Sequence, residues 1–328
     1  MGAYFSALLH DLKYQLNALP AGHKISSVFF GGGTPSLIEA HFYEPIFTAF
    51  SPYLAENFEL TMEANPNSLA KPWLKRMLGL GLNRLSLGTQ SFDAEKLHFL
   101  GRDHSKNESI SAVKLAQDLG LANINLDLIY GTKLDDGSLL ERELETLSGL
   151  NLAHVSAYSL SIEQNTRFGG ALGIDKKGYA KDDEDLARFF VKGLKDLGFI
   201  QYEISNFAAS AKDKCRHNLG YWAGQEYLGV GLSAVGFWRK RRSYTHEGLK
   251  SYIKDPLYRR NEVLKDSDLA LESLFLGLRS DLGVDTKLLK GSQKLELIKD
   301  LIRIDNSRIY NKDYFLADEL ALFLSEDL

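Results

Sequence analysis

Short apolar runs alternate with segments of helical periodicity over the first half of the chain. Five of the runs have the length and content of strands: Val28–Phe30, Phe58–Met62, Arg84–Leu87, Ile124–Ile129 and Val155–Leu160. Segments with apolar residues at helical spacing separate them, as at Leu69–Leu80 and Ile110–Leu119. The pattern therefore predicts a succession of strands and helices, with parallel strands in one sheet.

Glycine and polar residues occupy the ends of these predicted elements. Glycines that would cap helices before the chain returns to the sheet are Gly79, Gly81, Gly120 and Gly198. Polar and glycine segments follow the strands at Gly31–Gly33, Glu63–Pro66, Gly88–Gln90 and Asp127–Gly131. The carboxyl ends of parallel strands form one rim of an α/β sheet or barrel, and such folds bind their ligands there.

The first of these strand ends contains three consecutive glycines. Gly31–Gly33 can adopt positive φ and can bring the backbone close to a bound molecule. Pro35 would fix the direction in which the chain leaves, and Ser36 would cap the following helix. From the residues alone, this run is either a tight turn or part of a ligand site.

The pattern changes beyond about Phe168. Residues 175–185 are highly charged, and residues 202–237 are rich in Tyr, Asn, His, Trp and Gly. After Tyr252 the chain shows short helices with small apolar stripes and a strand-like Arg308–Tyr310. We therefore predict three domains: a core with a partial barrel (1–168), an extension (169–254) and a small, mainly helical C-terminal domain (255–328).

Composition narrows the class of protein. The 328 residues are 44% hydrophobic and 25% charged, which is enough to bury a sizeable core. The net charge of −4 disfavours nucleic acid as a partner, and no apolar run is long enough for a transmembrane segment, so we expect a cytoplasmic protein. One cysteine, Cys215, excludes a disulfide framework or a cysteine-built metal site within these residues.

Eight motifs carry a resemblance to a known family. Those in the first half are Phe30–Ser36, Glu63–Pro66, Asn83–Phe92, Gly101–His104 and Asn125–Gly131. Together they resemble the radical S-adenosylmethionine proteins related to oxygen-independent coproporphyrinogen III oxidase. Those in the second half are Tyr202–Ala208, Cys215–Trp222 and Tyr227–Gly231. They resemble the haem chaperone branch, HemW, whose signature is His-Asn followed by Tyr-Trp.

The resemblance implies an α/β fold and a cofactor site. The fold would be a partial parallel (β/α) barrel of the radical S-adenosylmethionine type that lacks its first strand. The residues assigned to S-adenosylmethionine are Gly32, Gly33, Thr34, Glu63, Gln90, Arg102 and Asp127. The glycines and Thr34 would hold the methionine part, Glu63 would face the cationic cofactor, and Arg102 would receive a carboxylate. Taken singly, Asp127 could instead cap a helix, and Arg102 could be a solvated surface charge.

The family's 4Fe–4S cluster has no ligands in this sequence. Its three cysteines, spaced CxxxCxxC, lie in the family just before a helix that corresponds here to about Tyr4–Leu19. One cysteine cannot supply three separate thiolates, so we predict no metal ligands and no catalytic residues for radical chemistry. Two explanations stay open: the chain is N-terminally shortened, or the protein has dispensed with the cluster.

The second candidate site is the aromatic motif around His217. An imidazole beside Tyr221 and Trp222 suits a porphyrin whose iron takes an axial histidine. The alternatives are a hydrogen-bonded core histidine and, for Cys215, either a thiolate ligand or an inert buried cysteine. The basic run Trp238–Arg242 could meet haem propionates, an acidic partner or anionic lipid, or could be a solvated hairpin.

The resemblance leads to one functional expectation and two alternatives. The expected function is that of a haem chaperone, which binds haem and delivers it to haem-accepting proteins or membrane-associated respiratory enzymes. The first alternative is an enzyme of porphyrin biosynthesis like the oxygen-independent coproporphyrinogen III oxidase. The second alternative is a degenerate scaffold that binds neither haem nor S-adenosylmethionine.

Overall fold

The computed structural model describes residues 1–162, 179–181 and 183–328. These residues form two compact units. Unit 1 comprises residues 1–28, 39–59 and 215–328, and unit 2 comprises residues 29–38 and 60–214. The predicted boundary between residues 168 and 169 lies outside the described residues, and the three-domain division stays a prediction.

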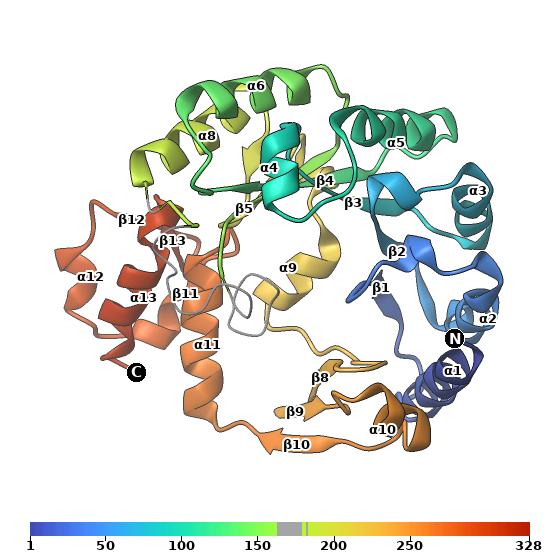
Figure 1. Ribbon diagram of the computed structural model, residues 1–328. Helices are drawn as coiled ribbons and strands as arrows, with labels where there is room; N and C mark the ends of the chain where they lie inside the picture. Colours follow the sequence, from blue (N-terminus) through green and yellow to red (C-terminus); the bar gives the residue numbers. More distant parts are fainter. Residues whose placement is uncertain (163–178, 182) are drawn as a thin grey trace. The chain divides into compact units, whose positions relative to one another are not determined.

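A seven-stranded sheet organises the first two thirds of the chain (Figure 1). In spatial order its strands are β1 (Ile25–Phe30), β2 (Leu54–Ala64), β3 (Arg84–Gln90), β4 (Ile124–Tyr130), β5 (His154–Ser159), β7 (Asn206–Ala208) and β6 (Ile200–Gln201). Strands β2 to β5 pair in parallel, and β7 is antiparallel to β5 and β6. The five strands predicted from the sequence are confirmed, and the fold is the predicted partial barrel.

Helices cover one face of β2 to β5 in unit 2, as Figure 1 shows. They are α3 (Lys71–Leu80), α5 (Lys106–Asp118), α6 (Gly137–Ser148) and α8 (Glu184–Asp196), with the short α4 (Ala94–Phe99) after β3. Gly81, Gly120 and Gly198 follow α3, α5 and α8 with φ of 111°, 85° and 94°, which confirms their role at helix ends. Gly79 instead lies inside α3.

Over most of their length, the strands of unit 2 alternate between an apolar and a polar face. Residues on the helix-covered face are buried and apolar: Leu60, Met62, Leu85, Leu87, Leu126, Leu128, Val155 and Phe207. The opposite face carries polar residues in register, with Glu63 beside Ser86, Ser86 beside Asn125 and Asn125 beside His154. A second row contains Asp127, Ser156 and Asn206. The polar face is therefore where this sheet can carry chemistry.

Unit 1 is assembled from three separate stretches of the chain. Its helices before the last module are α1 (Gly2–Asn17), α2 (Glu44–Phe50), α9 (Arg216–Trp222) and α10 (Leu249–Lys254), and its small sheet contains β8 (Val235–Trp238), β9 (Arg241–Tyr244) and β10 (Arg260–Val263). Asp11 of α1 is buried and accepts hydrogen bonds from Gly231 N at 3.3 Å and from the Tyr252 hydroxyl at 3.0 Å. These two hydrogen bonds join α1 to residues that lie more than two hundred positions away in the sequence.

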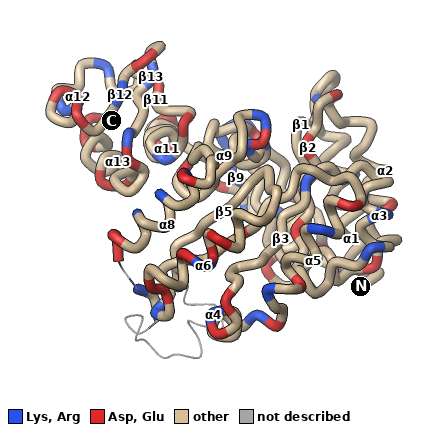
Figure 2. Tube along the Cα trace, turned by 90° about the horizontal axis from the view of Figure 1, so that it is seen from above, with Lys and Arg blue, Asp and Glu red and all other residues tan. Residues whose placement is uncertain are grey.

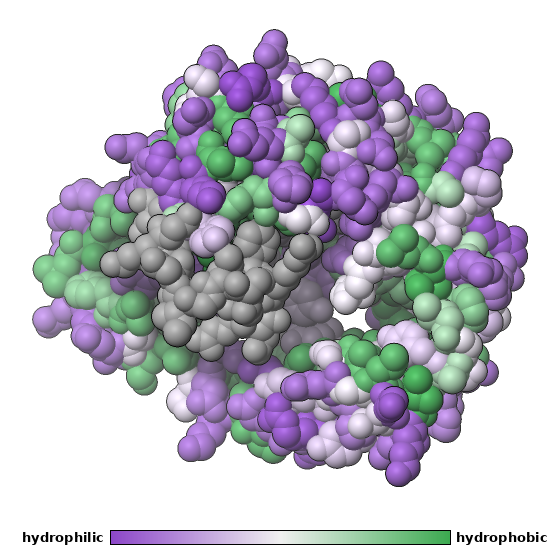
Figure 3. Space-filling view, viewed as in Figure 1, coloured by the Kyte–Doolittle hydropathy of each residue, from purple (hydrophilic) through white to green (hydrophobic). Residues whose placement is uncertain are grey.

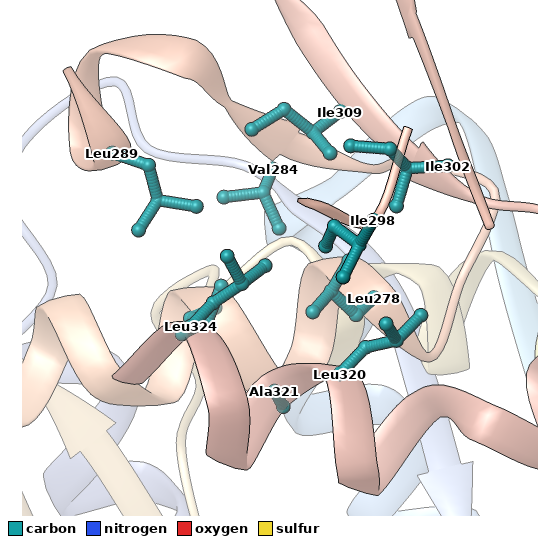
Figure 4. Packing of buried hydrophobic residues seen from close by; sticks show 10 residues of the cluster. Leu278, Val284, Leu289, Ile298, Ile302, Ile309, Leu320, Ala321 and Leu324 are labelled. Atoms are coloured by element: carbon teal, nitrogen blue, oxygen red, sulfur yellow. The ribbon is translucent and has the colours of Figure 1, made fainter. Parts of the chain in front are cut away.

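The C-terminal part of unit 1 has its own core (Figure 4). It contains α11 (Asp266–Leu278), β11 (Val284–Asp285), α12 (Lys294–Leu297), β12 (Ile302–Asp305), β13 (Arg308–Asn311) and α13 (Ala317–Ser325). Leu278, Val284, Ile309 and Leu324 point toward one another in Figure 4 and are almost fully buried. The predicted strand at Arg308–Tyr310 is confirmed as β13, between β11 and β12.

Short 3₁₀ helices connect several of these elements. They are η1 (Pro35–Leu37), η2 (Ala40–Phe42), η3 (Ser51–Tyr53), η4 (Pro66–Ser68), η6 (Ala211–Asp213), η7 (Thr286–Leu289) and η8 (Tyr314–Leu316). Ser36 lies inside η1, so the prediction that it caps a helix is wrong. Its hydroxyl accepts a hydrogen bond from Asn65 N at 3.3 Å instead.

The surface carries both signs of charge. Figure 2 shows Lys and Arg as well as Asp and Glu distributed along the chain, and Figure 3 shows a mainly hydrophilic surface over α6 and α8. Among the helices in the described ranges, none combines the length and the apolar content that crossing a bilayer requires.

Candidate functional site

The glycine loop after β1 lies against the Glu63 carboxylate at the end of β2. A Cβ atom on Gly31 would lie 2.9 Å from the Glu63 carboxyl carbon and 2.8 Å from Phe29 Cε1, so a larger residue would require these side chains to shift. Gly32 has φ of 86° and donates its backbone N–H to Glu63 Oε2 at 3.3 Å. A Cβ on Gly33 would meet no atom within 4 Å, which leaves open space beside the loop.

Glu63 and Asp127 are two carboxyl groups whose negative charges repel each other. Burial, and then the charge of Asp127, raises the pKa of Glu63 to about 6 against the hydrogen bond from Gly32. Burial also raises the pKa of Asp127, although the hydrogen bond from Asn125 and the nearby Arg84 guanidinium oppose this. Burial and the repulsion between the two carboxylates outweigh these contacts, and a bound cation would stabilise both charged forms.

Hydrogen bonds across three strands orient Asp127. Asn125 Nδ2 donates to Asp127 Oδ1 at 2.8 Å, and the Ser86 hydroxyl donates to Asp127 Oδ2 at 3.2 Å. With its amide nitrogen engaged, Asn125 uses Oδ1 to accept from His154 Nδ1 at 2.6 Å. His154 Nε2 then accepts from the Tyr202 hydroxyl at 2.8 Å. Burial lowers the pKa of His154 well below its ordinary value, so a neutral imidazole completes the network.

Gln90 sits in a strained turn at the end of β3. Its φ of 64° is left-handed, and the pairing of β3 with β4 shifts register between Leu87 and Gln90. A Cβ on Gly88 would lie 3.1 Å from Gln90 Nε2 and 3.5 Å from Asn65 Oδ1, so Gln90 and Asn65 are neighbours. Asn65 Nδ2 in turn lies 3.5 Å from the Thr34 hydroxyl. These contacts bring Thr34 and Gln90 to the same rim.

A buried ion cluster supports this turn and was not predicted from the sequence. Lys96 Nζ lies 2.7 Å from Asp135 Oδ1 and 3.2 Å from Glu143 Oε2, and all three side chains are fully or almost fully buried. Glu143 Oε1 accepts from the Ser91 hydroxyl and from Phe92 N, the two residues that follow Gln90. Because the cluster joins α4 and α6 to the turn, it fixes the backbone that presents Gln90.

Arg102 follows α4 in a loop next to η4. The neighbouring Asp103 accepts a hydrogen bond from Asn67 at 2.8 Å, and Asn67 belongs to the segment that follows Glu63. Arg102 Nε is buried, and no group in the described part of the chain accepts its hydrogen bond. A donor in that condition suits an anionic group of a ligand, such as a carboxylate.

His217 lies in unit 1, on the first turn of α9. Its Nδ1 lies 2.9 Å from the Ser27 hydroxyl of β1. The ring meets Tyr221 edge to face at 4.9 Å, and Tyr221 meets Tyr227 in the same way at 4.6 Å. Tyr221 is 41% exposed, so part of this aromatic array is open to solvent.

A buried carboxylate holds the start of α9. Glu59 of β2 accepts hydrogen bonds from Arg216 N at 2.9 Å and from His217 N at 3.1 Å. Cys215 is fully buried, with its sulfur 3.5 Å from the same carboxylate. Neither Glu59 nor Ser27 was predicted from the sequence, since each lies more than 150 positions from its partner.

The basic run near residue 240 forms the turn of the hairpin between β8 and β9. Arg239 and Lys240 take φ of 50° and 60° in that turn. Lys240 pairs with Asp266, and Arg242 Nη2 lies 2.8 Å from Glu272 Oε1. A hairpin, one of the four interpretations of this run, is therefore formed, and α11 supplies acidic partners to its Lys240 and Arg242.

Comparisons with known proteins identify the family. The profile of the Radical SAM superfamily matches residues 2–163. The haem chaperone HemW of Lactococcus lactis is 31% identical over 312 residues, which cover 88% of this chain and 81% of that protein. The chain belongs to the HemW family.

Two further comparisons show how much of another relative is matched and which solved structure has the same fold. HemW of Escherichia coli is 39% identical over 240 residues, which are 71% of this chain and 61% of that protein, so the match spans less than two thirds of that relative. The coproporphyrinogen III oxidase HemN of Escherichia coli has a TM-score of 0.81 at 19% identity, over 99% of this chain and 83% of that structure. That likeness establishes the fold.

The residues of this HemW family member fit one family cofactor and not the other. The open space at Gly33, the carboxyl pair and the orphaned Arg102 Nε suit the ammonium, sulfonium and carboxylate groups of S-adenosylmethionine. A 4Fe–4S cluster needs three thiolates, and the 328 residues contain one cysteine. The described residues also contain no group of three His, Cys, Asp or Glu side chains arranged to hold a metal ion.

Proposed function

We propose that this protein is a haem chaperone, which binds haem as cargo and releases it to haem-accepting proteins. The observation that carries the proposal is the arrangement of His217 beside the half-open aromatic array of Tyr221 and Tyr227. An imidazole can coordinate haem iron, and aromatic rings offer apolar surface to a porphyrin. The names of the HemW relatives support the same function.

His217 would be the axial ligand of the iron. Its Nδ1 contacts Ser27, and an iron-bound imidazole uses its other ring nitrogen, Nε2. Cys215 suits a ligand less well, because it is fully buried at the N-cap of α9, with its sulfur 3.5 Å from the Glu59 carboxylate. Membrane-associated respiratory enzymes are included in the proposal as acceptors of the cargo.

The proposal includes an S-adenosylmethionine pocket in unit 2. Gly32, Gly33 and Thr34 would hold the methionine part, Glu63 and Asp127 would face its positive charges, and Gln90 would contact the ribose or amino groups. Arg102 would pair with the carboxylate. With a reduced cluster, this cofactor supplies a 5′-deoxyadenosyl radical; these residues bind and orient the cofactor, and no radical step is assigned to them.

The reaction of the coproporphyrinogen oxidase is not part of the proposal. At 19% identity, the HemN structure shares the fold, and that likeness carries no statement about activity. The single cysteine of these residues does not provide the thiolates of the cluster on which that reaction depends.

A haem titration of the His217→Ala variant tests the proposed function. We expect the affinity for haem to fall by about tenfold or more, with a changed Soret band, since an iron ligand is lost. His246→Ala is the matched control, because His246 also packs on a tyrosine of unit 1, Tyr258, at 4.1 Å. Unchanged affinity and spectrum in His217→Ala would refute the ligand assignment.

A further inference from the structure

The ring of His217 has a defined partner on a neighbouring strand. The Ser27 hydroxyl on β1 lies 2.9 Å from Nδ1, in a half-buried position. Ser26, the preceding residue, points to the other face of the strand and is exposed. The contact is therefore specific to one of two adjacent serines.

A hydroxyl next to Nδ1 affects how the other ring nitrogen, Nε2, binds iron. When iron binds Nε2, Nδ1 carries the proton and donates it to an acceptor, which fixes the tautomer and the ring plane. Ser27 Oγ stands at the distance that such an acceptor requires. Histidines that ligate metals in proteins have this kind of outer partner as a rule, and its loss weakens binding.

The backbone of His217 is held by a second group. Glu59 is almost fully buried, and its two carboxylate oxygens accept from Arg216 N and His217 N at 2.9 and 3.1 Å. These N–H groups belong to the first turn of α9, which has no intrahelical acceptors for them. The carboxylate thus sets the position of the helix, while the serine sets the rotation of the ring.

We propose that Ser27 and Glu59 are positioning residues for haem ligation by His217. This inference rests on the proposed function, because it requires His217 to bind the iron. Three separate stretches of unit 1 contribute to the site: Ser27 from β1, Glu59 from β2 and His217 from α9. Removal of either positioning group leaves the ligand present but less well oriented.

The test compares Ser27→Ala with Ser26→Ala and with the conservative Ser27→Thr variant. We expect Ser27→Ala to speed haem loss to an apo-globin acceptor by about tenfold and to alter the electron paramagnetic resonance signal of the ferric haem. Ser26→Ala should behave as the parent, and Ser27→Thr should restore both readouts because it keeps the hydroxyl. Circular dichroism verifies that each variant is folded.

The outcomes separate this inference from the proposed function. If His217→Ala weakens haem binding and Ser27→Ala leaves the rate and the spectrum unchanged, the role of Ser27 is refuted while the haem function stands. If His217→Ala has no effect, both fail together. If Ser27→Thr behaves like Ser27→Ala, the hydroxyl is not the group that matters, and the inference is also refuted.

Glu59→Gln tests the second positioning group. An amide keeps the size of the side chain but replaces one acceptor oxygen by a donor, which would face a backbone N–H. We expect faster haem loss, again by about tenfold, with Glu56→Gln as the control on an exposed position of the same strand. Equal haem loss from both variants would overturn the role of Glu59.

Discussion

At the scale of single residues, unit 2 contains a carboxyl group whose surroundings disfavour its charged form. The pKa of Glu63 is raised to about 6 because its side chain is partly buried and because Asp127 lies nearby. The Gly32 N–H compensates in part. A Cβ atom at position 31 would lie 2.9 Å from the Glu63 carboxyl carbon, so a larger residue there would displace this carboxyl group.

The raised pKa of Glu63 predicts a pH-dependent stability. The protonated carboxyl favours the folded state, so its contribution is complete below the ordinary value of 4.5 and is lost as pH rises through about 6. Glu63→Gln stays neutral at every pH. The free energy of unfolding of this variant, relative to the parent, should therefore rise between pH 5 and pH 7.5, by about 1 kcal/mol after allowance for solvent.

Urea denaturation of both proteins at the two pH values measures this difference. Groups that titrate over this range without contacting Glu63 contribute equally to the free energy of unfolding of both proteins, so their effect cancels in the comparison. A difference that does not change with pH, or that falls as pH rises, would show that Glu63 has no raised pKa.

At the scale of elements, the sequences of the strands indicate both where the strands lie and which face of the sheet is polar. The apolar runs located β1 to β5, and the polar residues between the apolar ones, such as Ser86, Asn125 and Asp127, mark the other face. Asp127, which the sequence allows as a helix cap, lies within β4 and accepts hydrogen bonds from Asn125 and Ser86. Reading the alternation would have identified the polar face.

Other parts of the site could not be derived from the sequence. Ser27 and His217 are 190 positions apart, and nothing in the local sequence of either residue indicates the other. The same holds for Lys96 and Glu143, which look like ordinary solvated charges on amphipathic helices but are buried together. Pairings of this kind come from how the helices and strands pack, which local periodicity does not encode.

The buried cluster predicts a strong effect on stability. Glu143→Gln removes a charge that pairs with Lys96 and accepts from Ser91, so an ammonium group stays buried with less compensation. We expect the free energy of unfolding to fall by about 3 kcal/mol in urea denaturation. Glu141→Gln, an exposed position on α6, should change it by less than about 0.5 kcal/mol.

The two substitutions can be compared directly because both lie on the same helix. Similar losses in the two variants would mean that the helix, and not the ion cluster, is what the substitutions disturb. A loss confined to Glu143→Gln would support the role of the cluster in fixing the turn at Gln90.

At the scale of the whole molecule, the two candidate sites belong to different units. The residues proposed to bind S-adenosylmethionine all lie in unit 2, and His217 with its proposed positioning residues lies in unit 1. Unit 1 brings together three separate stretches of the chain, so the contacts of His217 join residues that lie far apart in the sequence. The likeness to the HemN structure establishes the fold of the barrel, and the cofactor pocket within it is part of the proposal.

The crystal structure of the haem-loaded protein tests the central claim most directly. We predict that the haem iron is bonded to His217 Nε2, that Nδ1 still contacts Ser27 Oγ, and that the porphyrin lies against Tyr221. Iron bonded to any other residue, or haem bound away from α9, would contradict the account.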